Sequence, residues 1–281
     1  MRRSFLVILV LISALSSTAQ YYYKDIVGIQ EASDLFKSYL KNGVTRVLVN
    51  SYDADNVKSD FLFVQQEFSA SKRMLKTVTG TGAENGNTSI LYTYADADSR
   101  IIKTIDSSGI VISITTYTYE PSGNLAVVSI SAADTTSDQS EQHIWQWAGG
   151  KPSKMLRIKN KRDTAVVDFK LDENGNVIEE VETRKKVQSK PYFYYYNNNH
   201  QLTDIARFSE RAGQLLPEYM FEYSSSNQVI QKITVPSNNS EYLIWRYQYN
   251  PQGLKTREVV YSKHDKRNPM GKIEYLYSFA R

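Results

Sequence analysis

A repeated motif constrains the fold of this chain more than any other feature. Two aromatic residues separated by one residue lead into a polar turn, and an apolar residue follows, as in YTYEPSGNLAVV at 117–128. The motif recurs roughly every 26 residues, which indicates a repeat architecture. The second aromatic residues of the successive copies are Phe68, Tyr94, Tyr119, Trp147, Phe169, Tyr196, Tyr223, Tyr249 and Tyr277.

Each copy predicts a β-hairpin, because residues alternate with a period of two on both sides of a turn rich in Gly and Asn. The 21 tyrosines also favour strands. We expect Gly123, Gly175 and Gly253 to adopt positive φ in these turns. Hairpins in sequence order predict an all-β fold, a long antiparallel meander that forms a curved or partly rolled open sheet.

The paired aromatic side chains should share one face of this sheet, because they recur in register. We expect that face to line the inside of the curve. It would carry Tyr92, Tyr94, Tyr117, Tyr119, Trp145, Trp147, Tyr194, Tyr196, Tyr247, Tyr249, Tyr275 and Tyr277.

A helix is predicted before the repeats, over the stretch IQEASDLFKSYLKNG, with Gly43 ending it. We expect it to cap one end of the sheet by burying Leu35, Phe36 and Tyr39. The predicted organisation is a signal peptide at 1–19, the helix and first strand at 20–58, and the hairpin repeats at 59–281.

The first residues, MRRSFLVILVLISALSSTAQ, are typical of a secretory signal peptide cleaved after Ala19. The chain has no cysteine, which excludes disulfides, thiolate metal sites and a lipoprotein anchor. We therefore expect a periplasmic or extracellular protein, and association with the outer membrane stays open. Its small net charge of +4 gives no reason to expect nucleic acid as a partner, and no other apolar run reaches the length of a transmembrane helix.

The segments YTYEPSGNL, YQYNPQGL and FKLDENGNV resemble the YD repeat, YxYDxxGxL, of the Rhs and teneurin shells. The layout is also similar to that of secreted Gram-negative repeat proteins with degenerate hairpins. The resemblance implies β-hairpin repeats and says little about activity. By this alignment the aspartate after the second aromatic is missing in every copy, and its place is taken by Ala95, Glu120, Ala148, Lys170, Asn197, Ser224 and Asn250.

The residues give little support to catalysis. The chain lacks a cysteine and a G-x-S-x-G nucleophile elbow. His143, His200 and His264 lie near turns in different repeats and are expected to be exposed, and Glu179 and Glu180 are expected to be solvated charges. The aspartates of DADNVKSD and DENGN are expected to form turns rather than calcium loops. We predict no enzyme activity, no cofactor and no metal.

Three functions stay open. The first is a protein-interaction platform in the cell envelope, the second a carbohydrate-binding protein, and the third an outer-membrane β-barrel, which is disfavoured because GLKTREVVYSK lacks an apolar face. Candidate contacts for a partner or glycan are Trp145, Trp147, Tyr192, Tyr194, Tyr195, Tyr196 and Trp245. Thr135 and Thr164 are candidate O-glycosylation sites, since each follows an aspartate in an expected turn.

Overall fold

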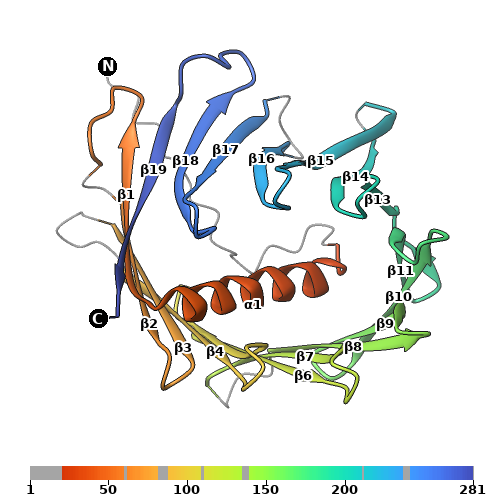
Figure 1. The fold of residues 1–281 in the computed structure, drawn as a ribbon. Helices are drawn as coiled ribbons and strands as arrows, with labels where there is room; N and C mark the ends of the chain where they lie inside the picture. The colour runs from red at the N-terminus through yellow and green to blue at the C-terminus, as the bar shows by residue number, and fades with distance from the viewer. Residues whose placement is uncertain are drawn as a thin grey trace.

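The computed structural model describes residues 21–59, 62–81, 88–108, 111–134, 139–210, 212–236 and 241–280. Figure 1 shows a ring of strands around one helix. The described elements are α1 (Lys24–Asn42), β1 (Val44–Asp53), β2 (Leu62–Ser69), β3 (Met74–Thr81), β4 (Thr88–Ala95), β5 (Ile101–Asp106), β6 (Ser113–Tyr119), β7 (Leu125–Ala132), β8 (Ser140–Ala148), β9 (Lys151–Lys159), β10 (Asp163–Leu171), β11 (Val177–Arg184), β12 (Val187–Gln188), β13 (Tyr192–Tyr196), β14 (Leu202–Ser209), β15 (Gln214–Tyr223), β16 (Val229–Thr234), β17 (Leu243–Tyr249), β18 (Lys255–Ser262) and β19 (Gly271–Phe279).

The sheet is closed, which corrects the prediction of an open curved sheet. β1 pairs with β2 on one side and with β19 on the other, and all the pairs are antiparallel. The short β12 and β13 both pair with β11, so together they act as one strand of an 18-stranded barrel. Closure depends on pairs such as Val47 with Tyr277, from opposite ends of the chain, and it removes the free edges of the sheet. No local pattern encodes such a pairing.

A recurrent turn connects the two strands of most hairpins. In the copy at 250–254, the Asn250 N–H donates to the Leu254 carbonyl at 2.9 Å, and the Gly253 N–H donates to the Asn250 carbonyl at 2.9 Å. The Asn250 side chain accepts the N–H groups of Gln252 and Leu254. Gly253 has φ 79°, a left-handed conformation that costs glycine little. Gly123 and Gly175 have φ 91° and 80°, so the predicted turn geometry is confirmed.

The turns also correct the alignment of the repeats. The same turn starts at Asp96, Glu120, Asp172, Asn197, Ser224 and Asn250. The last strand residue before the turn is therefore Ala95 in β4 and Leu171 in β10. The sequence alignment had assigned this position to Tyr94, which is one residue too early, and to Phe169, which is two residues too early. The prediction that the aspartate is missing in every copy was wrong, because Asp96 and Asp172 occupy that position and accept N–H groups of their own turns.

The aromatic residue before the turn joins neighbouring hairpins. Its hydroxyl or indole N–H donates to a backbone carbonyl at the start of a strand in the preceding hairpin. The pairs are Tyr119 to Ile101 (2.6 Å), Trp147 to Leu125 (2.8 Å), Tyr196 to Val177 (2.9 Å), Tyr223 to Leu202 (2.8 Å), Tyr249 to Val229 (2.8 Å) and Tyr277 to Lys255 (2.7 Å). The motif thus favours Tyr or Trp, which combine an apolar ring with a polar tip.

The paired aromatics point into the barrel in every predicted pair except the one in β4. Tyr92 lies opposite Lys76, and Tyr94 lies opposite Lys103, and both lysines are on the outer face. Ala95, rather than Tyr94, occupies the inward position and is buried. A shift of one residue moves a side chain to the other face of a strand. The prediction was therefore wrong for Tyr92 and Tyr94.

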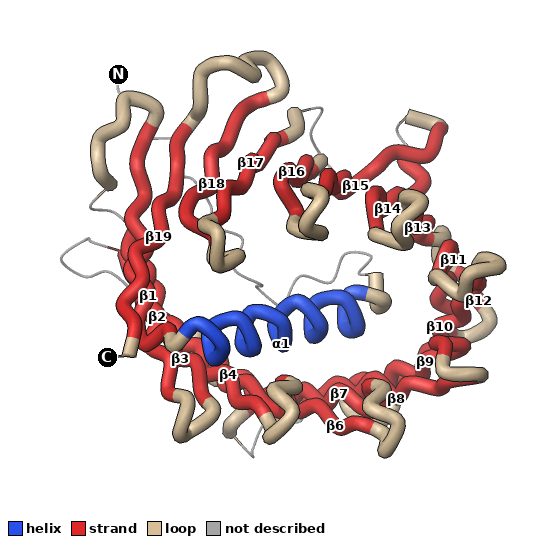
Figure 2. The backbone as a smooth tube through the Cα atoms, viewed as in Figure 1, coloured by secondary structure: helices blue, strands red, loops and turns tan. Residues whose placement is uncertain are grey.

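The helix lies inside the ring of strands, as Figure 2 shows, rather than capping its end as predicted. Phe36 packs against Phe68 with ring centroids 4.8 Å apart, and the Tyr39 hydroxyl donates to Gln66 at 2.7 Å. Leu35 stays 41% exposed, contrary to prediction. The predicted C-terminal residue is confirmed, with Gly43 at φ 65°. A barrel of this many strands is too wide for wall side chains alone to fill, so the helix contributes to the core. Among the described residues, no helix is both long and apolar enough to cross a membrane.

Candidate functional site: the interior of the barrel

A buried carboxylate fixes the beginning of the helix to the barrel wall. Glu180 on β11 is 3% exposed and accepts the N–H groups of Tyr22 and Tyr23 at 2.7 and 2.8 Å and the hydroxyl of Tyr194 at 2.7 Å. The helix has no side-chain cap of its own, and a carboxylate near a helix N-terminus is stabilising. Burial raises the pKa of Glu180 to about 7, although the three hydrogen bonds act in the opposite direction and lower it. The prediction of a solvated Glu180 was wrong.

His143 on β8 makes a second connection to the helix. Its Nδ1 lies 2.5 Å from Asp25 on α1, and its Nε2 lies 2.8 Å from Glu141. Burial disfavours the charged imidazolium, but the two carboxylates outweigh it and raise the pKa of His143 to about 9. The prediction of an exposed histidine was therefore wrong here. His200 and His264 are exposed, as predicted.

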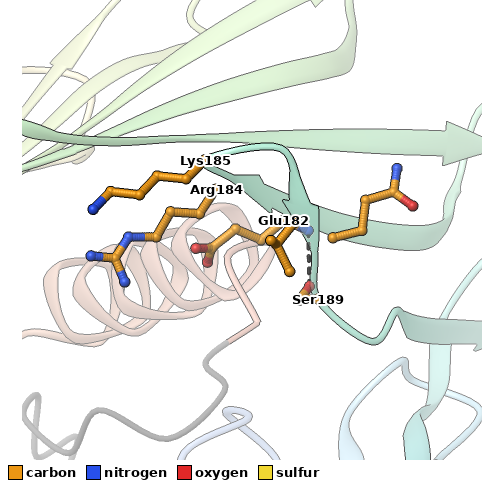
Figure 3. Close-up of a pocket in the computed structure, with 6 residues that line it drawn as sticks. Glu182, Arg184, Lys185 and Ser189 are labelled. Carbon is orange, nitrogen blue, oxygen red and sulfur yellow. Dashed lines mark hydrogen bonds between the residues drawn. The ribbon is translucent and has the colours of Figure 1, made fainter.

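Further contacts surround these two residues. The Tyr22 hydroxyl donates to Glu182 at 2.7 Å, and Arg157 lies 3.4 Å from the same carboxylate. A pocket borders Glu182 at the β11–β12 turn; Arg184, Lys185, Val187, Gln188 and Ser189 also line it. Figure 3 shows these side chains and the hydrogen bond from the Glu182 N–H to the Ser189 hydroxyl.

We call the group Tyr22, Asp25, His143, Glu180 and Glu182 the anchor cluster. Its members come from the start of the chain, β8 and β11. Each charged group in it is satisfied by a partner at hydrogen-bond distance. Such mutual satisfaction is typical of a structural connection rather than of a catalytic group that must bind a substrate.

The β7–β13 wall is the inner face on the side of the anchor cluster, and it is sealed. The N-terminal residues cover it, with Tyr23 5.2 Å from Tyr194 and Tyr21 5.7 Å from Tyr192 between ring centroids. The buried residues of this wall include Leu125, Val128, Trp145, Met155, Val167, Phe169, Val177, Tyr192 and Tyr194.

The β15–β18 wall is different. Its inward residues include aromatic side chains that stay partly exposed, interspersed with charges: Tyr219, Phe221, Tyr223, Lys232, Trp245, Tyr247, Tyr249, Lys255 and Glu258. The Lys232 ammonium lies 4.9 Å from the centre of the Tyr219 ring, and the Lys255 ammonium lies 4.4 Å from that of Tyr247. This wall combines ring faces, cations and access to water.

The helix turns its polar side toward the β15–β18 wall. Glu31 interacts electrostatically with Lys232 and Lys255. Burial raises the pKa of Glu31, although its side chain is exposed to water. Both hold together because a residue inside a barrel can be surrounded by protein and still be hydrated. Each of these lysines lies directly opposite an inward aromatic residue, Trp245 for Lys232 and Tyr249 for Lys255, and this pairing comes from the structure rather than from a signal in the sequence.

The aromatic residues predicted as partner or glycan contacts are divided among three environments. Trp145, Tyr192 and Tyr194 are 3%, 5% and 2% exposed and belong to the sealed wall. Trp147, Tyr196 and Trp245 are half-buried on the inner face. Only Tyr195 of the set faces outward, at 46% exposure.

The threonines and aspartates named from the sequence also have defined surroundings. Thr164 is exposed on the outer face of β10, whereas Thr135 lies outside the described residues. Asp53 and Asp172 accept N–H groups of their own turns. The described residues include no group of three or more His, Asp or Glu side chains that could hold a metal ion.

Comparison with known proteins gives only weak structural similarity. No protein-family model matches the chain, and no curated protein matches it. A porin-like protein from Bacteroides uniformis aligns at 11% identity with a TM-score of 0.40, over 84% of this chain and 97% of that one. One from Bacteroides vulgatus aligns at 12% identity with a TM-score of 0.20, over 84% and 98%.

Another similar structure is the Photorhabdus luminescens Tc holotoxin pore. It aligns at 12% identity with a TM-score of 0.33, over 78% of this chain and 12% of that much longer one. These proteins are similar to this chain in being built from β-strands. At such low identity and TM-score they assign neither a family nor an activity to it.

Proposed function

We propose that the protein is an exported, non-enzymatic barrel of the cell envelope that binds carbohydrate along the β15–β18 wall. The observation that carries this proposal is the row of partly exposed Trp and Tyr rings on the inner face, opposite the polar side of the helix. Flat aromatic faces stack on sugar rings, and their polar tips supply hydrogen bonds. A protein partner remains a prediction from the sequence.

The outer face of the barrel supports a location in water. Charged residues occupy the middle of many strands, and several pair across strands, such as Lys154 with Asp168 at 3.2 Å and Lys170 with Glu179 at 2.7 Å. A charge on the lipid face at the bilayer midplane costs about 2–4 kcal/mol for Lys or Arg. Most of the described strands are also shorter than the ~9–11 residues that membrane strands need.

The interior supports binding rather than free passage of solutes. Porin lumens are polar and filled with water, whereas here two hydrophobic clusters join the helix to the wall. The helix with its preceding residues would have to detach from the anchor cluster before a wide channel could open.

Binding is tested by titrating the protein with a panel of defined oligosaccharides in a calorimeter. The Tyr247→Ala variant, on the inner wall, should lose affinity roughly 5- to 30-fold, because stacking on an aromatic ring contributes on the order of 1–2 kcal/mol. Tyr195→Ala, on the outer face, is the matched control and should bind like the wild type. Equal affinity of both variants would contradict the proposal.

A second candidate, an outer-membrane barrel, is favoured by one observation, the closed ring of an even number of antiparallel strands. It predicts that the protein stays in the membrane pellet after alkaline extraction. Our proposal predicts release into the soluble fraction, because the outer charges keep the barrel in water. Retention in the pellet would favour the membrane barrel.

A further inference from the structure

Lys232 is a cation without an acidic partner in contact. Its ammonium lies over the rings of Tyr219 and Phe221, at 4.9 and 5.8 Å from their centres. Within the part of the chain that the structure describes, no carboxylate forms a salt bridge with it, and Glu31 and Glu258 interact with it electrostatically without such contact. Burial lowers the pKa of Lys232. A partly buried cation of this kind gains from any anion that reaches it.

Lys255 places a second cation near the first. It lies close enough to Lys232 for the two ammonium groups to repel each other electrostatically. The Glu258 carboxylate lies 2.9 Å from the Lys255 ammonium and partly neutralises its charge. The same carboxylate accepts a hydrogen bond from the Tyr275 hydroxyl at 2.5 Å. Lys232 is therefore the stronger candidate for an external anion, and Lys255 adds a favourable field.

The aromatic residues around the lysines define the rest of the ligand. Trp245 lies directly opposite Lys232 across β16 and β17, and Tyr247 and Tyr249 follow on the same inner face of β17. Ring faces beside a cation suit a molecule that carries an anionic group on a sugar ring. Glu31 on the facing helix disfavours excess negative charge, which argues for one carboxylate per sugar rather than a highly charged phosphate.

We propose that the β15–β18 wall binds an acidic carbohydrate of the uronic acid class, with its carboxylate at Lys232 and its sugar rings on Trp245 and Tyr247. This inference rests on the proposed carbohydrate-binding function and names its ligand class. Glu31 competes with the ligand carboxylate for Lys232, so it limits the affinity.

The test measures the binding of short oligomers of galacturonic, glucuronic and mannuronic acids, and of the same oligomers with esterified carboxyl groups, by calorimetry. The acidic form should bind 10- to 100-fold more tightly than the ester, as expected for a hydrogen bond to a charged group. Lys232→Gln should remove this difference, and Lys232→Arg should retain much of it. Lys170→Gln, on the outer face, is the control and should change nothing.

Glu31→Gln provides an independent readout. It should tighten binding of the acidic oligomers several-fold and leave the esters unaffected, because it removes the competing carboxylate. Melting curves confirm that each variant is folded.

If acids and esters bind equally well to the wild type and to Lys232→Gln, the uronate inference fails while carbohydrate binding stands. If neither form binds the wild type, and the neutral sugars of the wider panel do not bind either, both proposals fail.

Discussion

The β7–β13 and β15–β18 walls are built from the same hairpin motif and yet have opposite interiors. On both, an aromatic hydroxyl joins successive hairpins, as in Tyr196 to Val177 and Tyr249 to Val229. The first wall is covered by the N-terminal residues and sealed, whereas the second stays partly exposed and carries Lys232. The motif therefore specifies the wall, and the segment inside the barrel decides which part of the wall is available for binding.

The sealed wall depends on Glu180, so its removal should have the largest effect. Glu180→Ala leaves two buried donors and one partly buried donor without their acceptor, and we expect the free energy of unfolding to fall by about 4 kcal/mol. Glu179→Ala is the matched control one residue away, on the outer face, and should cost about 1 kcal/mol or less. Urea denaturation measures both. Similar losses for the two variants would show that the anchor cluster does not hold the sealed wall together.

His143 gives the sealed wall a pH dependence. Its pKa is about 9 in the folded protein and 6.5 as the ordinary value, so its stabilising contribution is complete below pH 6.5 and is lost as the pH rises through 9. Relative to His143→Gln, the wild type should lose roughly 3 kcal/mol of stability between pH 6 and pH 9.5. Glu180 has a raised pKa of about 7 and destabilises as it ionises between pH 4.5 and 7, but it does so in both proteins.

The measurement is the free energy of unfolding of both proteins across this pH range. A constant difference between wild type and His143→Gln would mean that folding does not shift the pKa of His143.

The tyrosine hydroxyls should contribute equally to both walls. Tyr196→Phe and Tyr249→Phe each remove one hydrogen bond to a backbone carbonyl, and each should cost about 1 kcal/mol. Tyr195→Phe, on the outer face, should be neutral. Thermal unfolding gives the comparison. A much larger loss for Tyr196 than for Tyr249 would mean that the hydrogen bond depends on the cover rather than on the hairpins.

The local parts of this fold could be predicted from the sequence. The turn of a single hairpin requires a residue with positive φ, and Gly123, Gly175 and Gly253 supply it. This requirement depends only on residues close in the chain. The alternation also placed most of the aromatic pairs on the correct face. It failed for Tyr92 and Tyr94, because the true turn start at Asp96 is one residue further from the aromatic than in most copies.

The remaining features depend on contacts between distant segments. Closure requires β1 to pair with β19, and the sealed wall requires Tyr22 and Tyr23 to meet Glu180. The sequence alone therefore made Glu180 look like a surface charge and Trp145 like a ligand contact. Lys232 lies on the same inner face as the aromatic residues, but the sequence pattern did not group it with them. Its role depends on the helix that lies opposite, which the sequence alone did not place there.

The central claim is that the two inner walls differ in their access to water, and single cysteines in this cysteine-free chain test it directly. Lys232→Cys on the β15–β18 wall should react with a small charged thiol reagent in the native state. Val167→Cys, on the β7–β13 wall where Val167 is 0% exposed, should react only after unfolding, and Lys170→Cys on the outer face should react fastest. Equal native reactivity at positions 232 and 167, or protection at both, would contradict the account.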